Sequence, residues 1–449
     1  MKAFTEPLLS LAGFEEMTKT AEKSSGLISV TGCIDAQKSQ MIYAFGGHRK
    51  NKLIVTFGEQ KAKELYDEYS FFDKEVVYYP SKAVLFYQSD IRGNLLTAER
   101  IRALKAIREQ ERVTLVTTFD ALMNTMAPIE KMWENVLTLE QGQLLDLKEI
   151  QAALIRMGYE KEYQVQTMGQ FSVRGGILDV FPLTEENPIR IELWGDEIDT
   201  IRYFDCESQK SIENIDRVSI YPAAELVLSD EEKAGGIEKL KAEAKRVSDK
   251  LRKQMKTEEA HRVSVMADEL TEEWGELSMY AGMDAFLSYF FDERVGLLDY
   301  FKPSDSLIFF DELTRCAEQG KLTETEFSES MKQRLAMGYI LPGQMNGLFT
   351  EKEIVAKLGK YSCIALAALD NKANGLHQLG SYGIHCQSVS PYNNSFELLI
   401  KDLKRYKKNG YRVILLSGSR TRAKRLSEDI TDQGITCFYT ENYDHELFE

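Results

Sequence analysis

The sequence predicts an α/β fold, in which a parallel sheet is interrupted by an antiparallel α+β domain and followed by a small C-terminal α/β domain. Three observations lead to this prediction. Short apolar runs alternate with amphipathic stretches at the start of the chain. A closely spaced group of β-type segments follows, and the first pattern then returns. The length of 449 residues is enough for several domains at about 100 to 200 residues each.

The charge balance limits the classes of partner. The 56 Lys and Arg residues and 71 Asp and Glu residues give a net charge of −15. Since phosphate-rich partners are bound by clustered Lys and Arg, this balance argues against a surface built mainly for DNA or an anionic membrane. Local basic patches stay possible. With 43% hydrophobic residues, the chain is expected to fold as a globular protein.

Targeting and redox signals indicate a cytoplasmic protein. The segment from Met1 to Phe14 lacks the sustained apolar region of an export signal, and no run approaches the roughly 20 apolar residues that span a bilayer. The six cysteines are scattered without a Cys-x-x-Cys pair, which predicts reduced thiols and no zinc site. We therefore expect no membrane association, no metal and no cofactor.

Apolar runs predict the buried strands of a first domain over residues 1–127. The runs are Leu27 to Thr31, Lys52 to Phe57, Glu75 to Tyr79 and Val113 to Thr118. Helices are predicted between them, over Gln60 to Tyr69 and Thr97 to Glu109. This alternation is typical of a parallel sheet covered by helices.

A change of pattern predicts an inserted domain over residues 128–228. A short helix is expected at Lys148 to Met157. Phe171 to Phe204 holds β-type segments that are too closely spaced for crossover helices, so their sheet is expected to be antiparallel. Residues 229–390 are then expected to begin with helices, from Ser229 to about Tyr289, and to complete the first domain with the apolar run Ser306 to Phe310.

Residues 391–449 are predicted to form a small α/β domain, which is expected to be truncated because one β-α-β unit cannot cover its own sheet. The expected order is a helix at Ser395 to Tyr406, a strand at Tyr411 to Ser417, a helix at Arg420 to Gln433 and a strand at Ile435 to Tyr439. Before this domain, Phe327 to Leu348 is predicted to be irregular and Tyr361 to Ala368 to be a strand.

A segment that matches the phosphate-loop motif at all but one of its defining positions follows the first predicted strand. Gly32 to Ser39 reads G-C-I-D-A-Q-K-S, which has the length, the Lys38 and the Ser39 of a G-x-x-x-x-G-K-[ST] loop. Gln37 stands where the second glycine is needed, and a side chain there obstructs the backbone cradle for phosphate.

An acidic pair follows the returning apolar run. Asp311 and Glu312 stand where a nucleotide-hydrolysing protein holds Mg²⁺ and its water. Together with the Gly32 loop they predict a degenerate P-loop NTPase domain, kept as a scaffold. An unusual ATP site is the alternative.

In the segment Ile189 to Trp194 (I-R-I-E-L-W), aliphatic residues alternate strictly with other residue types. Arg190 and Trp194 are therefore expected to lie on the face opposite the aliphatic residues. A turn at Gly195-Asp196 is expected to return the chain as a partner strand. An outward Trp beside an Arg has the composition of a protein-interface hot spot. Arg174, at the end of an upstream strand, is expected to extend this surface. The alternative is a Trp194 covered by a neighbouring loop.

Two longer motifs carry a family resemblance. They are G-Q-F-S-V-R-G-G-I-L-D-V-F-P, from Gly169 to Pro182, and W-G-D-E-I-D-T-I-R-Y-F-D, from Trp194 to Asp205. With these motifs and its order of elements, the chain resembles the amino-terminal part of the bacterial transcription-repair coupling factors, whose first domains resemble the excision-repair protein UvrB. The resemblance implies a RecA/UvrB-like fold for the degenerate domain.

The resemblance implies that this chain is not an enzyme. In UvrB the matching loop is intact and the acidic pair is followed by Ser-His, whereas Gln37 and Leu313-Thr314 stand here. Coupling factors resemble this degenerate state and do not hydrolyse ATP with this domain. UvrB also carries an aromatic-rich hairpin that wedges into damaged DNA. The matching region, Pro80 to Thr97, is too short for one, which implies no damage-probing role.

The resemblance also implies a partner. In the family the inserted domain binds UvrA through two arginines and an aromatic residue, which fall on Arg174, Arg190 and Trp194, with Trp in place of the more familiar Phe. The full-length family continues with an RNA-polymerase-binding domain, an ATP-dependent motor on double-stranded DNA, and a domain that masks the UvrA surface. Since those motifs are not found here, the chain is expected to be an amino-terminal fragment.

The sequence therefore favours a UvrA-recruiting module in transcription-coupled nucleotide excision repair. One alternative is a divergent ATPase that uses Lys38, Ser39 and Asp311. Another is DNA binding by a basic run that we expect to be a solvated helix face: Arg420, Arg422, Lys424 and Arg425.

Overall fold

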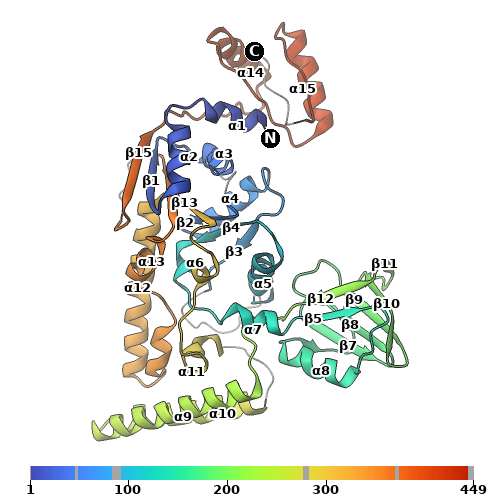
Figure 1. The fold of residues 1–449 in the computed structure, drawn as a ribbon, viewed down its shortest axis with the longest axis vertical. Coiled ribbons are helices and arrows are strands. Elements are labelled where there is room, and N and C mark those ends of the chain that lie inside the picture. The colour runs from blue at the N-terminus through green and yellow to red at the C-terminus, as the bar shows by residue number, and fades with distance from the viewer. Residues whose placement is uncertain (1, 46–48, 83–92, 277–282, 370–373, 443–449) are drawn as a thin grey trace.

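The computed structural model describes residues 2–45, 49–82, 93–276, 283–369 and 374–442. Its centre is a seven-stranded parallel sheet with the strand order β15-β1-β14-β13-β2-β4-β3 (Figure 1). The strands are β1 (Gly26–Thr31), β2 (Asn51–Thr56), β3 (Val77–Tyr79), β4 (Val113–Thr118), β13 (Ser306–Asp311), β14 (Ser362–Ala367) and β15 (Gln378–Gly383). The predicted α/β class with a parallel sheet is confirmed, and β15 is a strand that the sequence does not predict.

The apolar runs form strands that are buried on both faces. In β13, Ile308 and Phe310 join one core cluster, and Leu307 and Phe309 join the other. Because side chains alternate along a strand, a strand covered on both sides is expected to be a nearly continuous apolar run. Helices α1 (Lys2–Leu9), α2 (Phe14–Lys23), α3 (Asp35–Phe45) and α4 (Glu59–Tyr69) cover one face; α5 (Gly93–Glu109), α6 (Phe119–Met123), α12 (Leu313–Ala336) and α13 (Glu351–Leu358) cover the other.

Between β4 and β13 the chain forms a unit with a six-stranded sheet in the order β11-β10-β9-β8-β7-β6. The strands are β6 (Glu160–Lys161), β7 (Gln170–Arg174), β8 (Ile177–Val180), β9 (Ile189–Trp194), β10 (Glu197–Phe204) and β11 (Ser211–Ile215). All neighbours are antiparallel, as predicted, except the short β6, which pairs with β7 in parallel. Helix α8 (Leu147–Arg156) and the two-stranded sheet of β5 (Leu137–Glu140) and β12 (Arg217–Ile220) share the core of this unit, and α7 (Ile129–Glu134) precedes it.

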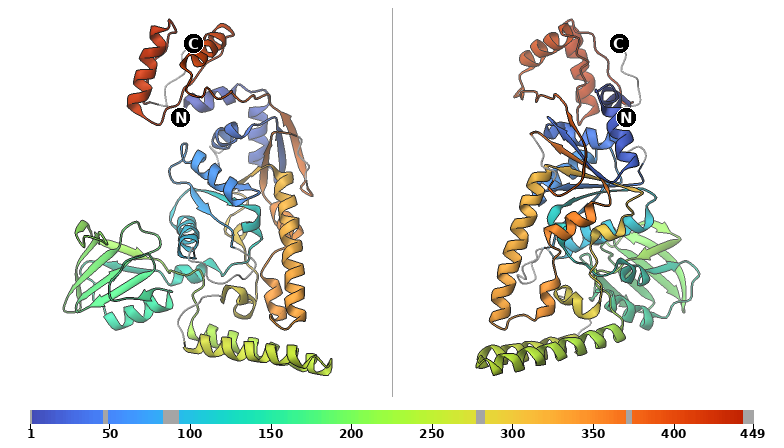
Figure 2. Two further views of the ribbon diagram at one scale, coloured as in Figure 1. Left: turned by 180° about the vertical axis from the view of Figure 1, so that it is seen from behind. Right: turned by 60° about the vertical axis from the view of Figure 1, so that its left-hand side comes forward.

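A long helical hairpin follows, formed by α9 (Asp230–Lys253) and α10 (Thr257–Glu276). Ser229 begins α9 with a capping box, in which its Oγ accepts from the Glu232 amide at 3.2 Å and Glu232 Oε2 accepts from the Ser229 amide at 2.9 Å. The base of the hairpin packs on α11 (Leu287–Phe290), and its other end extends away from the body (Figure 2). The predicted helices of this region are confirmed. Short 3₁₀ turns, η1 (Met283–Phe286) and η2 (Leu297–Tyr300), lead to β13.

One sequence prediction is wrong between β13 and β14. Residues 327–336 are not irregular but continue α12, because Phe327 and Met331 lie one turn apart on its buried face. The chain leaves the helix only near Gly338, and Pro342–Asn346 then forms the 3₁₀ turn η3.

The predicted C-terminal β-α-β unit is also wrong. Residues 391–442 contain α14 (Phe396–Lys408) and α15 (Arg420–Asp432), and the part of them that the structure describes contains no strand. The apolar run from Tyr411 to Ser417 and the segment from Ile435 to Tyr439 are irregular, with Leu416 and Phe438 exposed. A strand needs a hydrogen-bonded neighbour, and two short parallel segments are too few for an independently stable sheet. The helices instead share a small core.

All six cysteines are free thiols, as predicted. Burial raises the pKa of the Cys33 and Cys363 thiols to about 12, so both stay protonated near neutral pH. In the described residues we find no helix that is long and apolar enough to cross a bilayer.

A buried ion pair ties the segment that leaves the inserted unit to the parallel-sheet domain. Arg100 of α5 is fully buried; its Nε donates to Glu225 Oε1 at 2.7 Å, and its Nη2 donates to Oε2 at 3.0 Å. Lys82 Nζ lies 3.1 Å from the same Oε1. Burial raises the pKa of Glu225, but the charges of Arg100 and Lys82 outweigh burial and hold this pKa at about 2.

We expect Glu225→Ala to lower the free energy of unfolding by about 3 to 5 kcal/mol, because the Arg100 guanidinium stays buried without its counter-charge. Urea denaturation followed by circular dichroism at neutral pH measures this loss. The double variant Arg100→Met, Glu225→Leu removes both charges and should recover most of it; equal destabilisation by the double variant would contradict this account. Because the folded pKa of about 2 lies below the ordinary 4.5, the stabilisation is present above about pH 4.5 and is lost as the pH falls toward 2.

Candidate functional site

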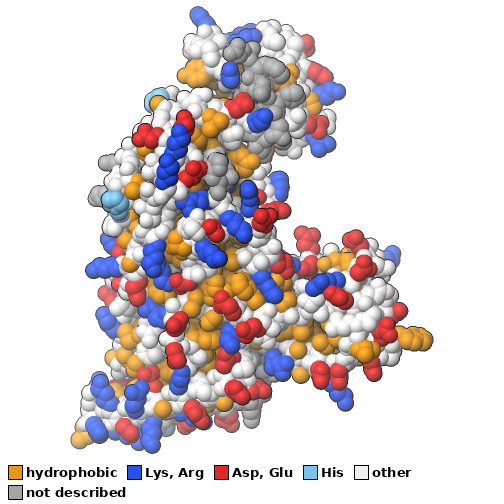
Figure 3. Space-filling view, viewed as in Figure 1, with side chains coloured by type: hydrophobic (Ala, Val, Ile, Leu, Met, Phe, Trp, Pro, Cys, Tyr) orange, Lys and Arg blue, Asp and Glu red, His pale blue; other side chains and the backbone are white. Residues whose placement is uncertain are grey.

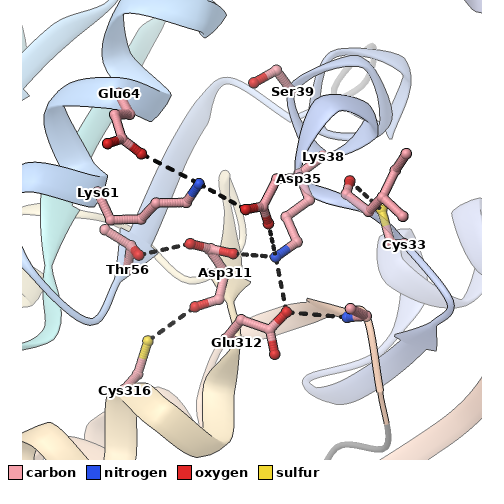
Figure 4. A network of polar contacts seen from close by, with 12 residues as sticks. Cys33, Asp35, Lys38, Ser39, Thr56, Lys61, Glu64, Asp311, Glu312 and Cys316 are labelled. Carbon is pink, nitrogen blue, oxygen red and sulfur yellow. Dashed lines mark hydrogen bonds and ion pairs between the residues drawn. The ribbon is translucent and has the colours of Figure 1, made fainter. Parts of the chain in front are cut away.

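The loop from Gly32 to Ser39 and the acidic end of β13 meet at one edge of the parallel sheet. Helix α3 begins at Asp35, so Lys38 lies in its first turn, and β13 ends at Asp311. The carboxyl ends of parallel strands lie at one edge, which brings these residues together. Lys38 Nζ contacts three carboxylates: Asp311 Oδ1 at 2.5 Å, Glu312 Oε1 at 2.9 Å and Asp35 Oδ1 at 2.9 Å (Figure 4).

The three carboxylates use the whole bonding capacity of the Lys38 ammonium. An ammonium has three N–H donors, and each has a carboxylate acceptor here. Burial lowers the pKa of Lys38, but the attraction of Asp311 and the hydrogen bonds to all three carboxylates outweigh burial and raise this pKa above its ordinary value. Lys38 is therefore charged and saturated, and it has no donor left for a phosphate.

The carboxylates are themselves fixed by further contacts. Asp311 Oδ2 accepts from Thr56 Oγ1 at 2.8 Å, Asp35 Oδ2 lies 3.1 Å from Lys61 Nζ, and Glu312 Oε1 accepts from the Ala368 amide at 3.0 Å. One oxygen from each of the three acids lies within 4.8 Å of the others, a spacing that suits a divalent cation. The Lys38 ammonium contacts all three of these acids and supplies that positive charge from the chain itself.

The remaining loop residues have other roles. A Cβ at Gly32 would lie 2.0 Å from the carbonyl oxygen of Ile384, so the chain after β15 requires this glycine, whose φ is +80°. Gln37 Oε1 is buried and has no hydrogen-bond partner among the described residues. Ser39 Oγ lies 3.4 Å from Glu68 Oε2 and takes no part in the Lys38 network (Figure 4). The structure thus unites Lys38 with the acidic pair and leaves Ser39 apart.

On the inserted unit, both predicted arginines bind one buried carboxylate. Arg190 Nε donates to Asp179 Oδ1 at 2.7 Å and its Nη2 donates to Oδ2 at 2.8 Å; Arg174 Nη2 donates to the same Oδ2 at 2.9 Å. Arg190 Nη2 also donates to Gln209 Oε1 at 2.8 Å, and its guanidinium stacks 4.3 Å from the Phe204 ring. This bidentate pair fixes the arginine fork in one orientation.

Trp194 lies at the end of β9, beside the turn to β10. Its side chain is 85% exposed, so the alternative of a Trp194 covered by a neighbouring loop is wrong. It shares a face of β9 with Arg190, four residues away, or about 13 Å along the strand. It also lines an open groove together with Glu140, Asp199 and Asp216.

Sequence reasoning missed Asp179 and Gln209. Asp179 is the one charged residue in the otherwise apolar β8, and that departure from an apolar strand is the signal that could have found it. Gln209 carried no such signal, because it lies in a turn with a left-handed φ of +58° and reaches Arg190 only through the fold.

Two further predictions concern nucleic acid. The four basic residues of α15 are exposed, and Arg420 Nε lies 3.3 Å from Glu441 Oε2. Both observations agree with the predicted solvated helix face. The region Pro80 to Thr97, matched to the UvrB hairpin, lies partly outside the described residues.

Residues 137–226 match the family of the UvrB interaction domain. The chain is 26% identical over 392 residues to a transcription-repair-coupling factor of Bacillus subtilis, which covers 87% of this chain and 33% of the relative. It is 25% identical to those of Staphylococcus haemolyticus and Staphylococcus aureus, over 91% and 94% of this chain and 34% and 35% of the relatives. The chain thus spans about a third of the length of the curated relatives that it matches.

Both comparisons agree with the motifs around Arg174 and Trp194, and the resemblance predicted from them is confirmed: the chain carries a segment of the UvrB interaction domain family and is similar, over most of its length, to about a third of a transcription-repair-coupling factor.

Proposed function

We propose that this chain recruits UvrA during transcription-coupled nucleotide excision repair, through the outer face of the sheet that carries Arg174, Arg190 and Trp194. One observation carries the proposal: the segment that matches the UvrB interaction domain holds an exposed Trp194 and a fixed arginine pair on one sheet. Exposed tryptophan and oriented arginine are the residues that dominate protein interfaces.

The two arginines differ in what they offer a partner. Asp179 balances one of their two charges, so the pair presents one net positive charge. The Arg174 side chain is 37% exposed and that of Arg190 is 13% exposed. Arg190 therefore organises the surface and contributes one edge of its guanidinium, while Arg174 is the arginine that meets an acidic group of UvrA.

The parallel-sheet domain is proposed to be a degenerate P-loop NTPase domain of the RecA/UvrB type, which serves as a scaffold and not as an enzyme. The saturated Lys38 and the side chain of Gln37 support this role. In a longer protein of this family, RNA polymerase and double-stranded DNA would be engaged by other domains. Partners of this kind imply a cytoplasmic protein.

Trp194→Ala should weaken the binding of UvrA by about 30-fold, as expected for a central aromatic anchor. Because Trp194 is 85% exposed, this substitution leaves the fold intact. Co-elution from a sizing column and surface plasmon resonance with purified UvrA measure the change. Leu322→Ala, which trims another exposed apolar residue on α12, is the matched control and should bind like the wild type. Wild-type affinity of Trp194→Ala would refute this docking surface.

Charge reversal at Arg174 separates docking from folding. Arg174→Glu should abolish co-elution with UvrA because it places a carboxylate where the partner meets a cation. Arg190→Glu should also abolish it, and with a larger loss of stability than Arg174→Glu, because the less exposed Arg190 gives the buried Asp179 two hydrogen bonds whereas Arg174 gives it one. Thermal unfolding distinguishes the two; a stable Arg174→Glu variant that still binds UvrA would argue against a role of this arginine.

The ATPase alternative is tested at Lys38. We expect no saturable binding of a fluorescent ATP analogue, because the Lys38 ammonium has no free donor. Lys38→Ala should instead lower the free energy of unfolding by about 3 to 5 kcal/mol, since it leaves buried Asp311 without its cation. Saturable analogue binding that is lost in Lys38→Ala would favour the ATPase.

A further inference from the structure

We propose that the exposed side of the second half of α9, up to its turn to α10, binds the phosphate backbone of double-stranded DNA. Between residues 241 and 256 the chain has seven basic and two acidic residues, a local charge of +5 in a chain of net charge −15. The seven are all exposed: Lys241, Lys245, Arg246, Lys250, Arg252, Lys253 and Lys256. This surface, called the basic tip below, lies on other elements than the proposed UvrA surface, so the inference goes beyond the proposed function.

The charge of the basic tip is largely uncompensated. Of the seven residues, Arg246 alone has an ion pair within the described residues, with Glu243 at 3.4 Å. The carboxylate of Glu243 also accepts hydrogen bonds from Tyr289 and from the Gly343 amide. An anionic partner therefore meets cations that the protein itself leaves unpaired.

Two like-charged pairs on α9 repel each other, and Asp249, four residues from Lys245 and from Lys253, offsets part of this repulsion. Lys241 and Lys245, and likewise Arg246 and Lys250, are four residues apart on α9, where like charges cost about 0.2 to 0.5 kcal/mol per pair. The helix dipole favours basic residues in the last turn, but its effect does not reach back to Lys241 and Lys245. A polyanion that binds along the helix relieves this repulsion.

The basic tip is held on a rigid support. Ser248 Oγ of α9 donates to the Ala260 carbonyl of α10 at 3.0 Å, and Arg262 Nε of α10 donates to the Met337 carbonyl at 2.9 Å. A Cβ at Gly338 would lie 2.6 Å from the Glu259 carbonyl oxygen, so the hairpin rests directly on the chain after α12. Figure 3 shows blue Lys and Arg side chains gathered over the end of this hairpin, at the lower left of the molecule.

The chemistry of the basic tip favours nucleic acid over an acidic protein. Protein interfaces are built around apolar and aromatic anchors. Within residues 241–256 the exposed large hydrophobic residue is Met255, beside the seven cations. Contacts to a phosphate backbone need cations alone and carry no sequence preference.

The test is a titration of a fluorescein-labelled, random-sequence DNA duplex of about 30 base pairs with the full chain, followed by anisotropy over a series of salt concentrations. The variant Lys241→Gln, Lys245→Gln, Arg246→Gln, Lys250→Gln should bind at least about 10-fold more weakly, and its slope of log K against log salt should fall by about 2 to 4. It should still co-elute with UvrA.

The matched control is Lys302→Gln, Lys332→Gln, Lys352→Gln, Lys360→Gln, which removes the same charge from exposed positions elsewhere and should bind DNA like the wild type. Absence of saturable binding by the wild type, wild-type affinity of the hairpin variant, or equal losses in both variants would overturn the proposal. Polyglutamate is the second probe: a hairpin variant that loses polyglutamate but keeps the duplex would assign the basic tip to an acidic protein instead.

Discussion

The fold depends on the pairing of β13 between β2 and β14, because the inserted unit and the long hairpin both lie between β4 and β13 in the chain. Phe309 pairs with Ile54 on one side and with Ile364 on the other. Since side chains from β13 enter both core clusters, its polar residues lie at its two ends, Ser306 and Asp311. Closure of the sheet carries Asp311 to Lys38, 273 residues away in the chain.

This closure sets the lysine of the Gly32 to Ser39 loop against the acidic end of β13. In a working loop the lysine and the acidic strand end are held apart by nucleotide and metal. Here they bind each other, with Asp35 and Glu312 as further acceptors. Gly32 is required by the approach of Ile384, which is unrelated to phosphate. Each surviving residue of the motif except Ser39 thus contributes to packing or charge balance within the domain.

The sequence predicts well the elements that follow from hydrophobic patterning. It predicts poorly those that depend on a neighbouring strand. Leu307 to Phe310 is apolar at every position and lies in a central strand; Val413 to Leu416 is equally apolar but has no neighbouring strand among the described residues. The pattern is the same in both runs, because it records hydrophobicity and not strand pairing. Strand β15 (Q-L-G-S-Y-G) was missed for the opposite reason, since its partner β1 makes it a strand despite weak propensity. The Lys38–Asp311 contact follows from motif spacing, whereas Asp179 joins Arg174 and Arg190 only through the register of three strands.

Three groups of cations in this chain differ in how far the protein itself balances their charge. Lys38 is buried and has an acidic acceptor for each donor, which leaves nothing for a ligand and makes it a structural cation. Arg174 and Arg190 share one acid, so they are oriented and keep one charge in excess, as a selective protein interface requires. The basic tip is exposed and mostly unpaired, which suits long-range attraction without selectivity. The desolvation cost of a charge rises with burial, and its attraction for a partner falls with internal pairing. The three groups therefore differ in the same order as their proposed functions, which are scaffold, specific docking and sequence-independent contact.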